Sequence, residues 1–316
     1  MRLVVCAGLA LWSLASPLLA VQRGPLKVLT TFLPVYCFAA NVAGDFAQVQ
    51  NLLPANVEPH DYQFSRKDLQ KLSDADLVFA NGLGIEKWLD KALEVAGGPR
   101  AARVVEISAG LEPELILNPS SSQPISLHAS RASVAASRFS YNPHFWLDPQ
   151  LAARAVTNIL RALQASDPAH AGEYASNAAA YVARLEKLDR ELQAQLAPVG
   201  GVSIITYHDA FPYFARRYGL RVTGVVEAVA DVEPSLKYLA GLYRSARASE
   251  ARAIFSEPPS VPRLARQIGR DLGLPVGQLD TLEAGALEAG AYEDAMLRNG
   301  QTLLNYLNQN ASRLTR

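Results

Sequence analysis

The sequence is short of cysteine. Its 316 residues include only Cys6 and Cys37, and Cys6 falls in a segment that we expect to be removed. A mature chain that keeps Cys37 alone cannot form an intramolecular disulfide, and it lacks the closely spaced cysteines of most structural zinc sites. No cysteine stands at the expected cleavage point, so we expect no lipid attachment there.

The chain also has no excess of charge of either sign. Lys+Arg and Asp+Glu both number 30, and the sequence pI is near 7.0. This balance argues against a nucleic-acid-binding surface and against a polybasic membrane anchor. Hydrophobic content of 49% with 19% charged residues is typical of a soluble globular protein, and the length suffices for two ordinary domains or one large one.

Long apolar runs are missing apart from one near the start. Met1-Arg2 is followed by an apolar stretch from Leu3 to Leu14, too short to span a membrane comfortably, and Ser16-Pro17-Leu18-Leu19-Ala20 then ends in a small residue. This pattern predicts a secretory signal over residues 1–20, cleaved near Ala20. We therefore expect a protein exported to the periplasm, working as a monomer.

The mature chain alternates between strand and helix patterns. Short alternating units favour parallel sheets covered by helices, so the expected fold class is α/β, with two βα lobes joined by one long rigid helix. The expected divisions are an N-terminal lobe at 21–166, a linking helix at 167–197 and a C-terminal lobe at 198–316. A Ser-rich segment, 119–141, is expected to be a long exposed loop. The predicted strands are Leu26–Phe32, Val49–Leu53, Leu77–Ala80, Arg103–Ile107, Val202–Thr206, Val222–Val226, Ala253–Phe255 and Pro275–Leu279; the long helix runs from Pro168 to about Leu196, and shorter helices include Ile85–Val95, Pro149–Ala165 and Tyr292–Leu307.

Histidine is scarce too, and three of the five histidines share a pattern. His60, His144 and His208 each lie at a turn with an acidic residue close behind. Imidazole is a preferred ligand for borderline-soft metals. Three such residues indicate a metal held between distant parts of one fold. His128 and His170, in a polar loop and at a helix start, are interpreted as surface or hydrogen-bonding residues.

The predicted strands place two of these histidines at the carboxyl ends of strands, whereas His144 begins a helix-entry segment after the long loop. His60 and His208 follow strands, and Asp280 directly follows Pro275–Leu279. Ligands collect at the carboxyl ends of strands in open α/β sheets. A metal bound by His60, His144, His208 and Asp280 would lie in the interlobe cleft, with Glu257 or water as the other candidates for the fourth position.

The acidic residues behind the histidines have two candidate roles. A carboxylate can accept the second N–H of a metal-bound imidazole and so orient the ring. Asp61, Asp148 and Asp209 are candidates for this role. Asp148 precedes Pro149, so a helix cap is the favoured interpretation there.

At these motifs the chain resembles the substrate-binding proteins of bacterial zinc and manganese ABC importers (the cluster A-I type), and it is most similar to their periplasmic zinc receptors. The similarity covers nearly the whole mature chain. It is carried by Thr30-Thr31-Phe32-Leu33-Pro34, Glu58-Pro59-His60-Asp61-Tyr62, Ala75-Asp76-Leu77-Val78-Phe79-Ala80-Asn81-Gly82-Leu83-Gly84, Asn142-Pro143-His144-Phe145-Trp146-Leu147-Asp148-Pro149, Thr206-Tyr207-His208-Asp209-Ala210-Phe211 and Leu279-Asp280-Thr281-Leu282.

The resemblance implies metal ligands at His60, His144 and His208, with Asp280 as a fourth ligand in some members. Manganese-type relatives carry a carboxylate where this chain has His208. Three nitrogens and one oxygen suit tetrahedral zinc, whereas manganese prefers more oxygen. Zinc receptors of this family often have a His- and acid-rich loop before the second ligand, but segment 119–141 holds only His128. A secondary zinc-collecting site is therefore not expected there.

Three functions are compatible with a group of histidines of this kind. The first is a receptor that captures Zn²⁺ and delivers it to an ABC permease in the inner membrane, with a manganese or iron receptor of the same family as its alternative. The second is a zinc hydrolase, but the sequence has no His-Glu-x-x-His helix that would supply ligands and a base together. Purely structural zinc is the third, and the shortage of cysteine disfavours it. The expected protein is therefore a binding protein and not an enzyme.

Overall fold

The computed structural model describes residues 24–60, 62–97, 103–118, 141–227, 234–259 and 261–309. The expected signal segment, 1–20, and nearly all of the expected loop at 119–141 lie outside the described residues. Within the described ranges, no helix combines the length and the apolar character needed to cross a membrane.

The first lobe is built on a four-stranded sheet in which every pair of neighbours is parallel, in the order β2-β1-β3-β4. Central strand β3 is buried along its whole length, as expected where helices cover both faces of a parallel sheet. Its elements are β1 (Leu26–Thr30), α1 (Leu33–Ala43), β2 (Ala47–Asn51), α2 (Arg66–Asp74), β3 (Leu77–Ala80), α3 (Leu89–Ala96) and β4 (Arg103–Glu106).

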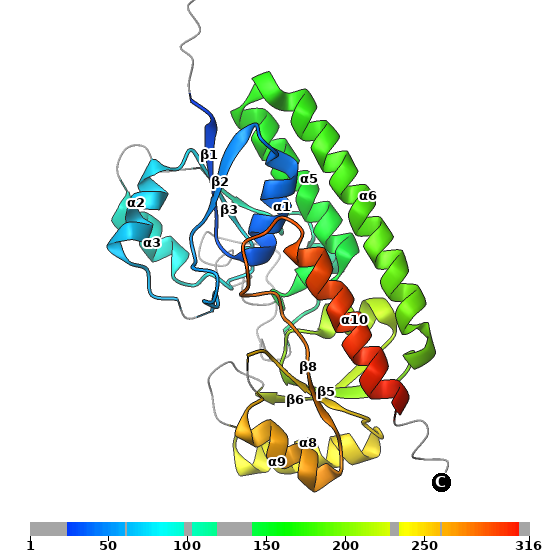
Figure 1. Cartoon of the computed structure of the whole chain (residues 1–316). Coiled ribbons are helices and arrows are strands. Elements are labelled where there is room, and N and C mark those ends of the chain that lie inside the picture. Colours follow the sequence, from blue (N-terminus) through cyan, green and yellow to red (C-terminus); the bar gives the residue numbers. More distant parts are fainter. Residues whose placement is uncertain are drawn as a thin grey trace, which may run out of the picture.

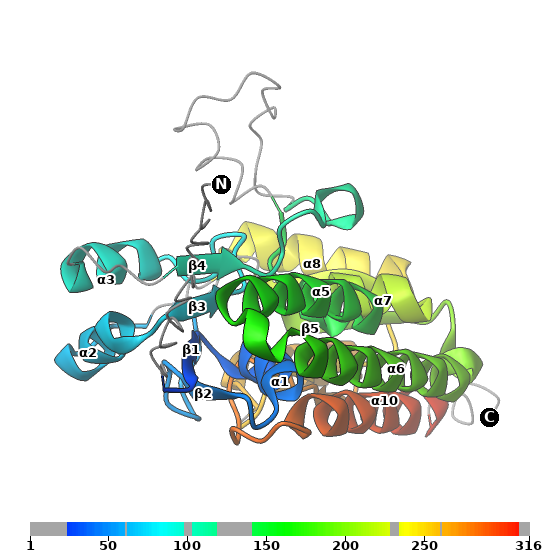
Figure 2. The same ribbon diagram turned by 90° about the horizontal axis from the view of Figure 1, so that it is seen from above.

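The second lobe repeats this arrangement with a sheet in the order β6-β5-β7-β8, again parallel throughout. In both sheets the chain first moves to one side and then crosses to the other, so the topological switch points lie between β1 and β3 and between β5 and β7. Figures 1 and 2 show the two sheets with their helices. The elements here are β5 (Ser203–His208), α7 (Pro212–Tyr218), β6 (Arg221–Glu227), α8 (Leu236–Ala248), β7 (Ile254–Ser256), α9 (Arg263–Leu272) and β8 (Val276–Gln278).

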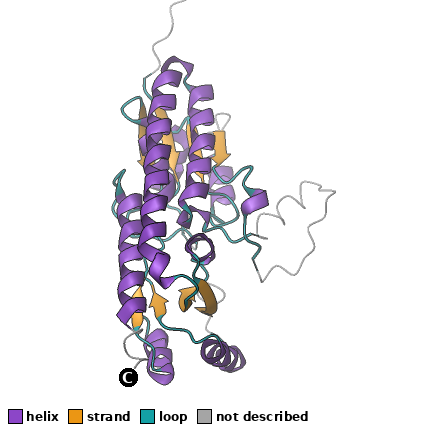
Figure 3. Cartoon of the chain, turned by 90° about the vertical axis from the view of Figure 1, so that its right-hand side faces the viewer, coloured by secondary structure: helices purple, strands orange, loops and turns teal. Residues whose placement is uncertain are grey.

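A long helix runs beside both lobes (Figures 1 and 3). α6 (Ala171–Leu196) is preceded by a 3-10 turn at Pro168–His170 and followed by another at Ala197–Val199. It packs against α5 (Pro149–Ser166), α1 and the final helix α10 (Ala291–Gln309). The expected long linking helix is confirmed, and its neighbours hold it along its length.

One continuous core crosses from lobe to lobe. The main cluster of buried apolar residues includes Val28 of β1, Leu185 of α6, Phe255 of β7 and Leu303 of α10. A smaller cluster around Ile268 fills the far side of the second sheet. Because a close-packed interior resists deformation, this shared core fixes how the two lobes lie relative to each other near their junction.

The start of α3 and the bounds of the two lobes can be compared with the sequence expectations. The helix predicted from Ile85 begins only at Leu89, because the buried carboxylate of Glu86 accepts hydrogen bonds from the backbone N–H groups of Asn81 and Gly82 and holds a loop there. The two sheets lie within 21–166 and 198–316, and we propose these as the lobe boundaries. α10 departs from this simple division, since it packs on α1 and α6.

Candidate metal centre

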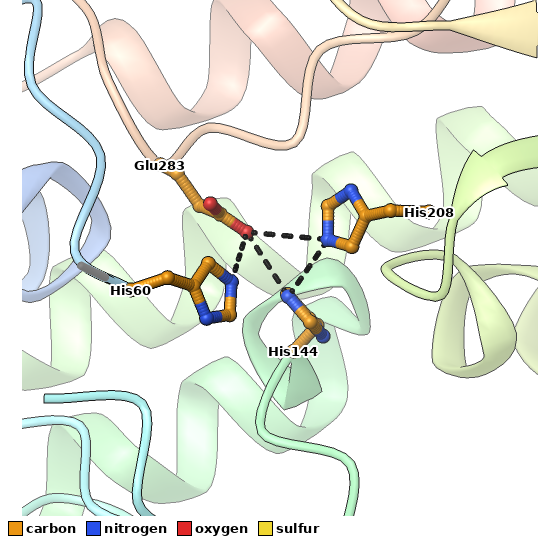
Figure 4. A group of neighbouring side chains, drawn as sticks. All are labelled: His60, His144, His208 and Glu283. Carbon is orange, nitrogen blue, oxygen red and sulfur yellow. Dashed lines mark hydrogen bonds and ion pairs between the residues drawn. The ribbon is translucent and has the colours of Figure 1, made fainter. Parts of the chain in front are cut away.

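Three histidines and one glutamate converge between the lobes (Figure 4). His60 lies in the loop after β2, where the indole N–H of Trp88 donates to the Pro59 carbonyl at 2.7 Å. His144 precedes a 3-10 turn at Phe145–Leu147. His208 ends β5, next to the switch point of the second sheet, and Glu283 lies in the loop between β8 and α10.

The four side chains present their ligand atoms to one point. Glu283 Oε1 lies 3.5 Å from His60 Nε2, 3.0 Å from His144 Nε2 and 3.7 Å from His208 Nε2. The Nε2 atoms of His144 and His208 are 3.2 Å apart. A tetrahedral zinc site with bonds of about 2.0–2.1 Å has donor–donor distances of about 3.3–3.4 Å. These four distances are close to those of a tetrahedral metal site, and all four ligand atoms lie within 4.8 Å of one another.

Burial supports the same interpretation. The side chains of His144 and Glu283 are only 4% and 2% exposed, whereas His60 and His208 lie nearer the surface. Among the described residues, His60 Nε2 and Glu283 Oε1 are buried atoms with no hydrogen-bond partner. Since buried polar atoms nearly always have a partner, such atoms aimed at one point fit the binding of a metal ion.

The protonation of His144 follows from its neighbour Asn142. The Asn142 amide N–H donates to the Asp209 carbonyl at 2.6 Å, and the backbone N–H of His144 donates to Asn142 Oδ1 at 3.0 Å. These contacts fix Oδ1 as the atom 2.9 Å from His144 Nδ1. An amide oxygen can only accept, so Nδ1 carries the hydrogen and Nε2 presents its lone pair to the centre.

The pKa values of the three histidines and Glu283 depend on burial and on the charges of their neighbours. Burial lowers the pKa of His144 to about 4. Burial alone would also lower the pKa of His208, but the negative charge of Glu257, which accepts a hydrogen bond from Nδ1, raises it to about 9. Burial opposes ionisation of Glu283, yet the imidazoles of His144 and His60, whose Nε2 atoms lie 3.0 Å and 3.5 Å from its Oε1, hold its pKa well below the usual range. For His60, burial is outweighed by Glu283, and its pKa is raised.

The carboxylate that the structure brings into this group is Glu283, and the expected Asp280 is not part of the group. Asp280 Oδ1 accepts from the backbone N–H of Leu282 at 2.8 Å, and its own backbone N–H and carbonyl are bonded to Asn299 of α10. Asp280 thus makes a turn, as an Asp after a strand commonly does. The turn brings Glu283 into the cluster. The signal in the sequence was the tendency of an Asp after a strand to form a turn, and the carboxylate three residues further on, Glu283, enters the cluster.

The other candidate residues lie as follows. Asp148 caps α5 by accepting from the backbone N–H of Gln150, which confirms the favoured interpretation. The side chain of Asp209 accepts from the Asn142 amide rather than from a histidine. His170 pairs with Asp167 at a helix start, away from the cluster. Asp61 and His128 lie outside the described residues.

Comparison with known proteins places this geometry in a family. Residues 28–306 match the model of the family described as "Zinc-uptake complex component A periplasmic" (ZnuA). The chain belongs to the ZnuA family. Members of this family are extracytoplasmic, non-enzymatic receptors that bind metal ions and deliver them to ABC transporters.

The chain is similar in sequence and in fold to individual proteins of known name. The chain is 31% identical to the high-affinity zinc uptake system protein ZnuA of Bacillus subtilis, over 89% of this chain and 88% of that protein. It is 29% identical to the zinc-binding protein AdcA of Streptococcus pyogenes serotype M6, over 92% of this chain, but it spans only 58% of AdcA. The structure of the substrate-binding protein FpvC of Pseudomonas aeruginosa with Ni²⁺ has a TM-score of 0.76 at 29% identity, covering 91% of this chain and 98% of FpvC.

Proposed function

We propose that this chain is a periplasmic zinc receptor that binds Zn²⁺ with high affinity and delivers it to an ABC importer in the inner membrane. His60, His144, His208 and Glu283 would be the ligands. The observation that carries the proposal is the set of three imidazole nitrogens and one carboxylate oxygen, all within 4.8 Å of one another. Export with cleavage near Ala20 and action as a monomer belong to the same proposal.

The chemical type and the number of the donor atoms favour zinc. Three nitrogens and one oxygen at tetrahedral spacing suit Zn²⁺, whereas Mn²⁺ prefers more oxygen ligands in octahedral geometry. Two relatives, ZnuA of B. subtilis and AdcA, are named for zinc. With all four positions occupied by protein atoms, no open position remains for an activated water, which supports capture of the metal without chemistry.

A second candidate, a receptor for manganese or another first-row metal, is favoured by one observation. FpvC, similar in fold at a TM-score of 0.75 to 0.76, has been solved with Mn²⁺ and with Ni²⁺. The His208 position separates the two candidates, because a nitrogen there disfavours manganese.

The test is metal analysis of the protein as isolated, followed by competition between Zn²⁺ and Mn²⁺ against a fluorescent zinc indicator. We expect one Zn²⁺ per chain, strong preference over Mn²⁺, and severe loss of affinity in His60→Ala and His208→Ala. His170→Ala is the matched control, since His170 lies outside the cluster. Unchanged affinity in the His60 and His208 variants would contradict the assignment; preference for Mn²⁺ would support the second candidate.

A further inference from the structure

A carboxylate that is not among the four donors contacts one of them from behind. Glu257 follows β7, and its Oε1 accepts a hydrogen bond from His208 Nδ1. The other ring nitrogen, Nε2, is the one that faces Glu283 and His144. Because the two nitrogens lie on different sides of the ring, Glu257 and the metal position are separated by the imidazole. Glu257 is therefore not placed as a fourth ligand.

The register of the second sheet builds this pair. In the parallel pairing of β5 with β7, Thr206 lies opposite Phe255. Two residues further along each strand, at the switch point, come His208 and Glu257. The backbone of Glu257 is also held from β8, where Gln278 Nε2 donates to the Glu257 carbonyl at 3.0 Å. Three adjacent strands thus fix the carboxylate behind the imidazole.

We propose that Glu257 is a positioning residue that keeps the hydrogen of His208 on Nδ1 and directs the Nε2 lone pair at the metal. The inference rests on the proposed metal-binding function. A metal-bound histidine that donates to a carboxylate is fixed in tautomer and ring orientation and becomes a more basic ligand. His144 has the equivalent support from the neutral amide oxygen of Asn142, so the two supports differ in charge.

The carboxylate of Glu257 also affects the net charge of the metal-loaded site. A divalent cation held by three neutral imidazoles and Glu283 leaves one uncompensated positive charge at a site where His144 and Glu283 are buried. Uncompensated charge away from water is costly. The negative charge of Glu257, directly behind His208, makes the loaded site neutral. We expect it to slow metal release as well as raise affinity.

The test compares Glu257→Ala and the isosteric Glu257→Gln with Glu58→Gln. Glu58 interacts electrostatically with Glu283 and Glu257 but, among the described residues, it forms no hydrogen bond to His208. The probe is Zn²⁺, read by indicator competition and by the ¹⁵N resonances of the imidazoles, of which the chain has only five. His208→Ala identifies the His208 signals.

We expect Glu257→Ala to raise the Kd for Zn²⁺, corrected for the proton that zinc displaces from His208, by about 10- to 100-fold, as for loss of other supports of metal ligands. Glu257→Gln should lose less, because an amide oxygen can still accept from Nδ1. Glu58→Gln should change Kd by less than about threefold in physiological salt. The protected Nδ1–H resonance of zinc-bound His208 should disappear in Glu257→Ala and persist in Glu58→Gln.

The outcomes separate this inference from the proposed function. If His208→Ala abolishes zinc binding while Glu257→Ala keeps both the wild-type Kd and the Nδ1–H resonance, the positioning role is overturned and the receptor function stands. If the wild-type chain takes up no Zn²⁺, the proposed function itself fails. Circular dichroism confirms folding, and Glu257→Gln provides a variant of unchanged volume.

Discussion

The indole Nε1 of Trp146 lies 2.8 Å from the carbonyl oxygen of Thr281 and donates a hydrogen bond to it. The bond ties the segment that carries His144 to the loop that carries Glu283. The hydroxyl of Tyr292, on α10, donates to the Trp146 carbonyl at 2.6 Å and completes the connection. Two ligand-bearing segments more than a hundred residues apart in sequence are thus joined directly beside the proposed metal.

Trp146→Phe tests this connection. The substitution keeps an aromatic ring next to Phe32, whose ring centroid is 5.1 Å from that of Trp146, but it leaves the buried Thr281 carbonyl without its donor. We expect a loss of about 1–3 kcal/mol in unfolding free energy, since an unsatisfied buried acceptor costs that much. Urea unfolding of the metal-free protein measures it. Wild-type stability in this variant would mean that the bond is unimportant.

The identity of the fourth ligand gives a second prediction. Glu283→Gln should raise the Kd for Zn²⁺ by at least about a hundredfold, because loss of a mere support of a ligand already costs about 10- to 100-fold. Asp280→Asn is the matched control, three residues away, and the turn that Asp280 forms can persist with Asn. Indicator competition measures both. A larger loss in Asp280→Asn than in Glu283→Gln would restore Asp280 as the ligand.

Zinc binding should release protons in a defined pH range. The pKa of His208 is about 9 in the metal-free protein, because the charge of Glu257 outweighs burial. His208 is therefore protonated at pH 7, and zinc must displace that proton. We expect release of about one proton per Zn²⁺ from this residue and an affinity that rises about tenfold per pH unit between pH 7 and 9. Calorimetry in buffers of different ionisation enthalpy measures the release.

The same pKa fixes how stability depends on pH. The folded pKa of His208 lies above the unfolded value of about 6.5, so the ion pair with Glu257 stabilises the metal-free protein fully below pH 6.5. That contribution is lost as pH rises through about 9. Thermal unfolding with a chelator present should show it, and Glu257→Gln should flatten this part of the profile. An equally steep decline in Glu257→Gln would assign the effect to another group.

Glu86 offers a prediction away from the metal. Its buried carboxylate accepts from the Thr31 hydroxyl at 2.8 Å and from the backbone N–H of Asn81 at 2.7 Å, which joins the ends of β1 and β3. Burial raises the pKa of Glu86 to about 7. We expect Glu86→Ala to lower stability by several kcal/mol, since each stranded buried donor costs about 1–3 kcal/mol.

Glu86→Gln should be much milder, because its amide oxygen still accepts. Folding with a raised carboxyl pKa favours the protonated form, so the wild type should lose stability as pH rises from about 4.5 through 7, and Glu86→Gln should not. Denaturant unfolding of the wild type and of Glu86→Gln at about pH 4.5 and about pH 7 measures this difference in stability. Equal losses in the Ala and Gln variants would exclude the hydrogen bonds as the cause.

Much of this protein followed from local patterns. Alternating apolar runs and helix caps such as Asp148 predicted the βα repeats, and the unbroken stretch after Pro168 predicted α6. Periodicity and capping are properties of neighbouring residues, so the sequence alone could specify them. The helix predicted at Ile85 failed for the converse reason: a tertiary hydrogen-bond acceptor, Glu86, overrode local preference.

For the metal site too, part could be predicted from the sequence and part depended on the tertiary structure. Three scarce histidines at turns were enough to predict which imidazoles lie together, because their residue type and their place at turns are visible in the sequence. Which carboxylate joins them was decided by the turn at Asp280 and its bonds to Asn299, nineteen residues away. Likewise, only the pairing of β5 with β7 placed Glu257 behind His208. Chemistry of single residues is local, but donor geometry depends on contacts between distant segments, and these exist only in the folded chain.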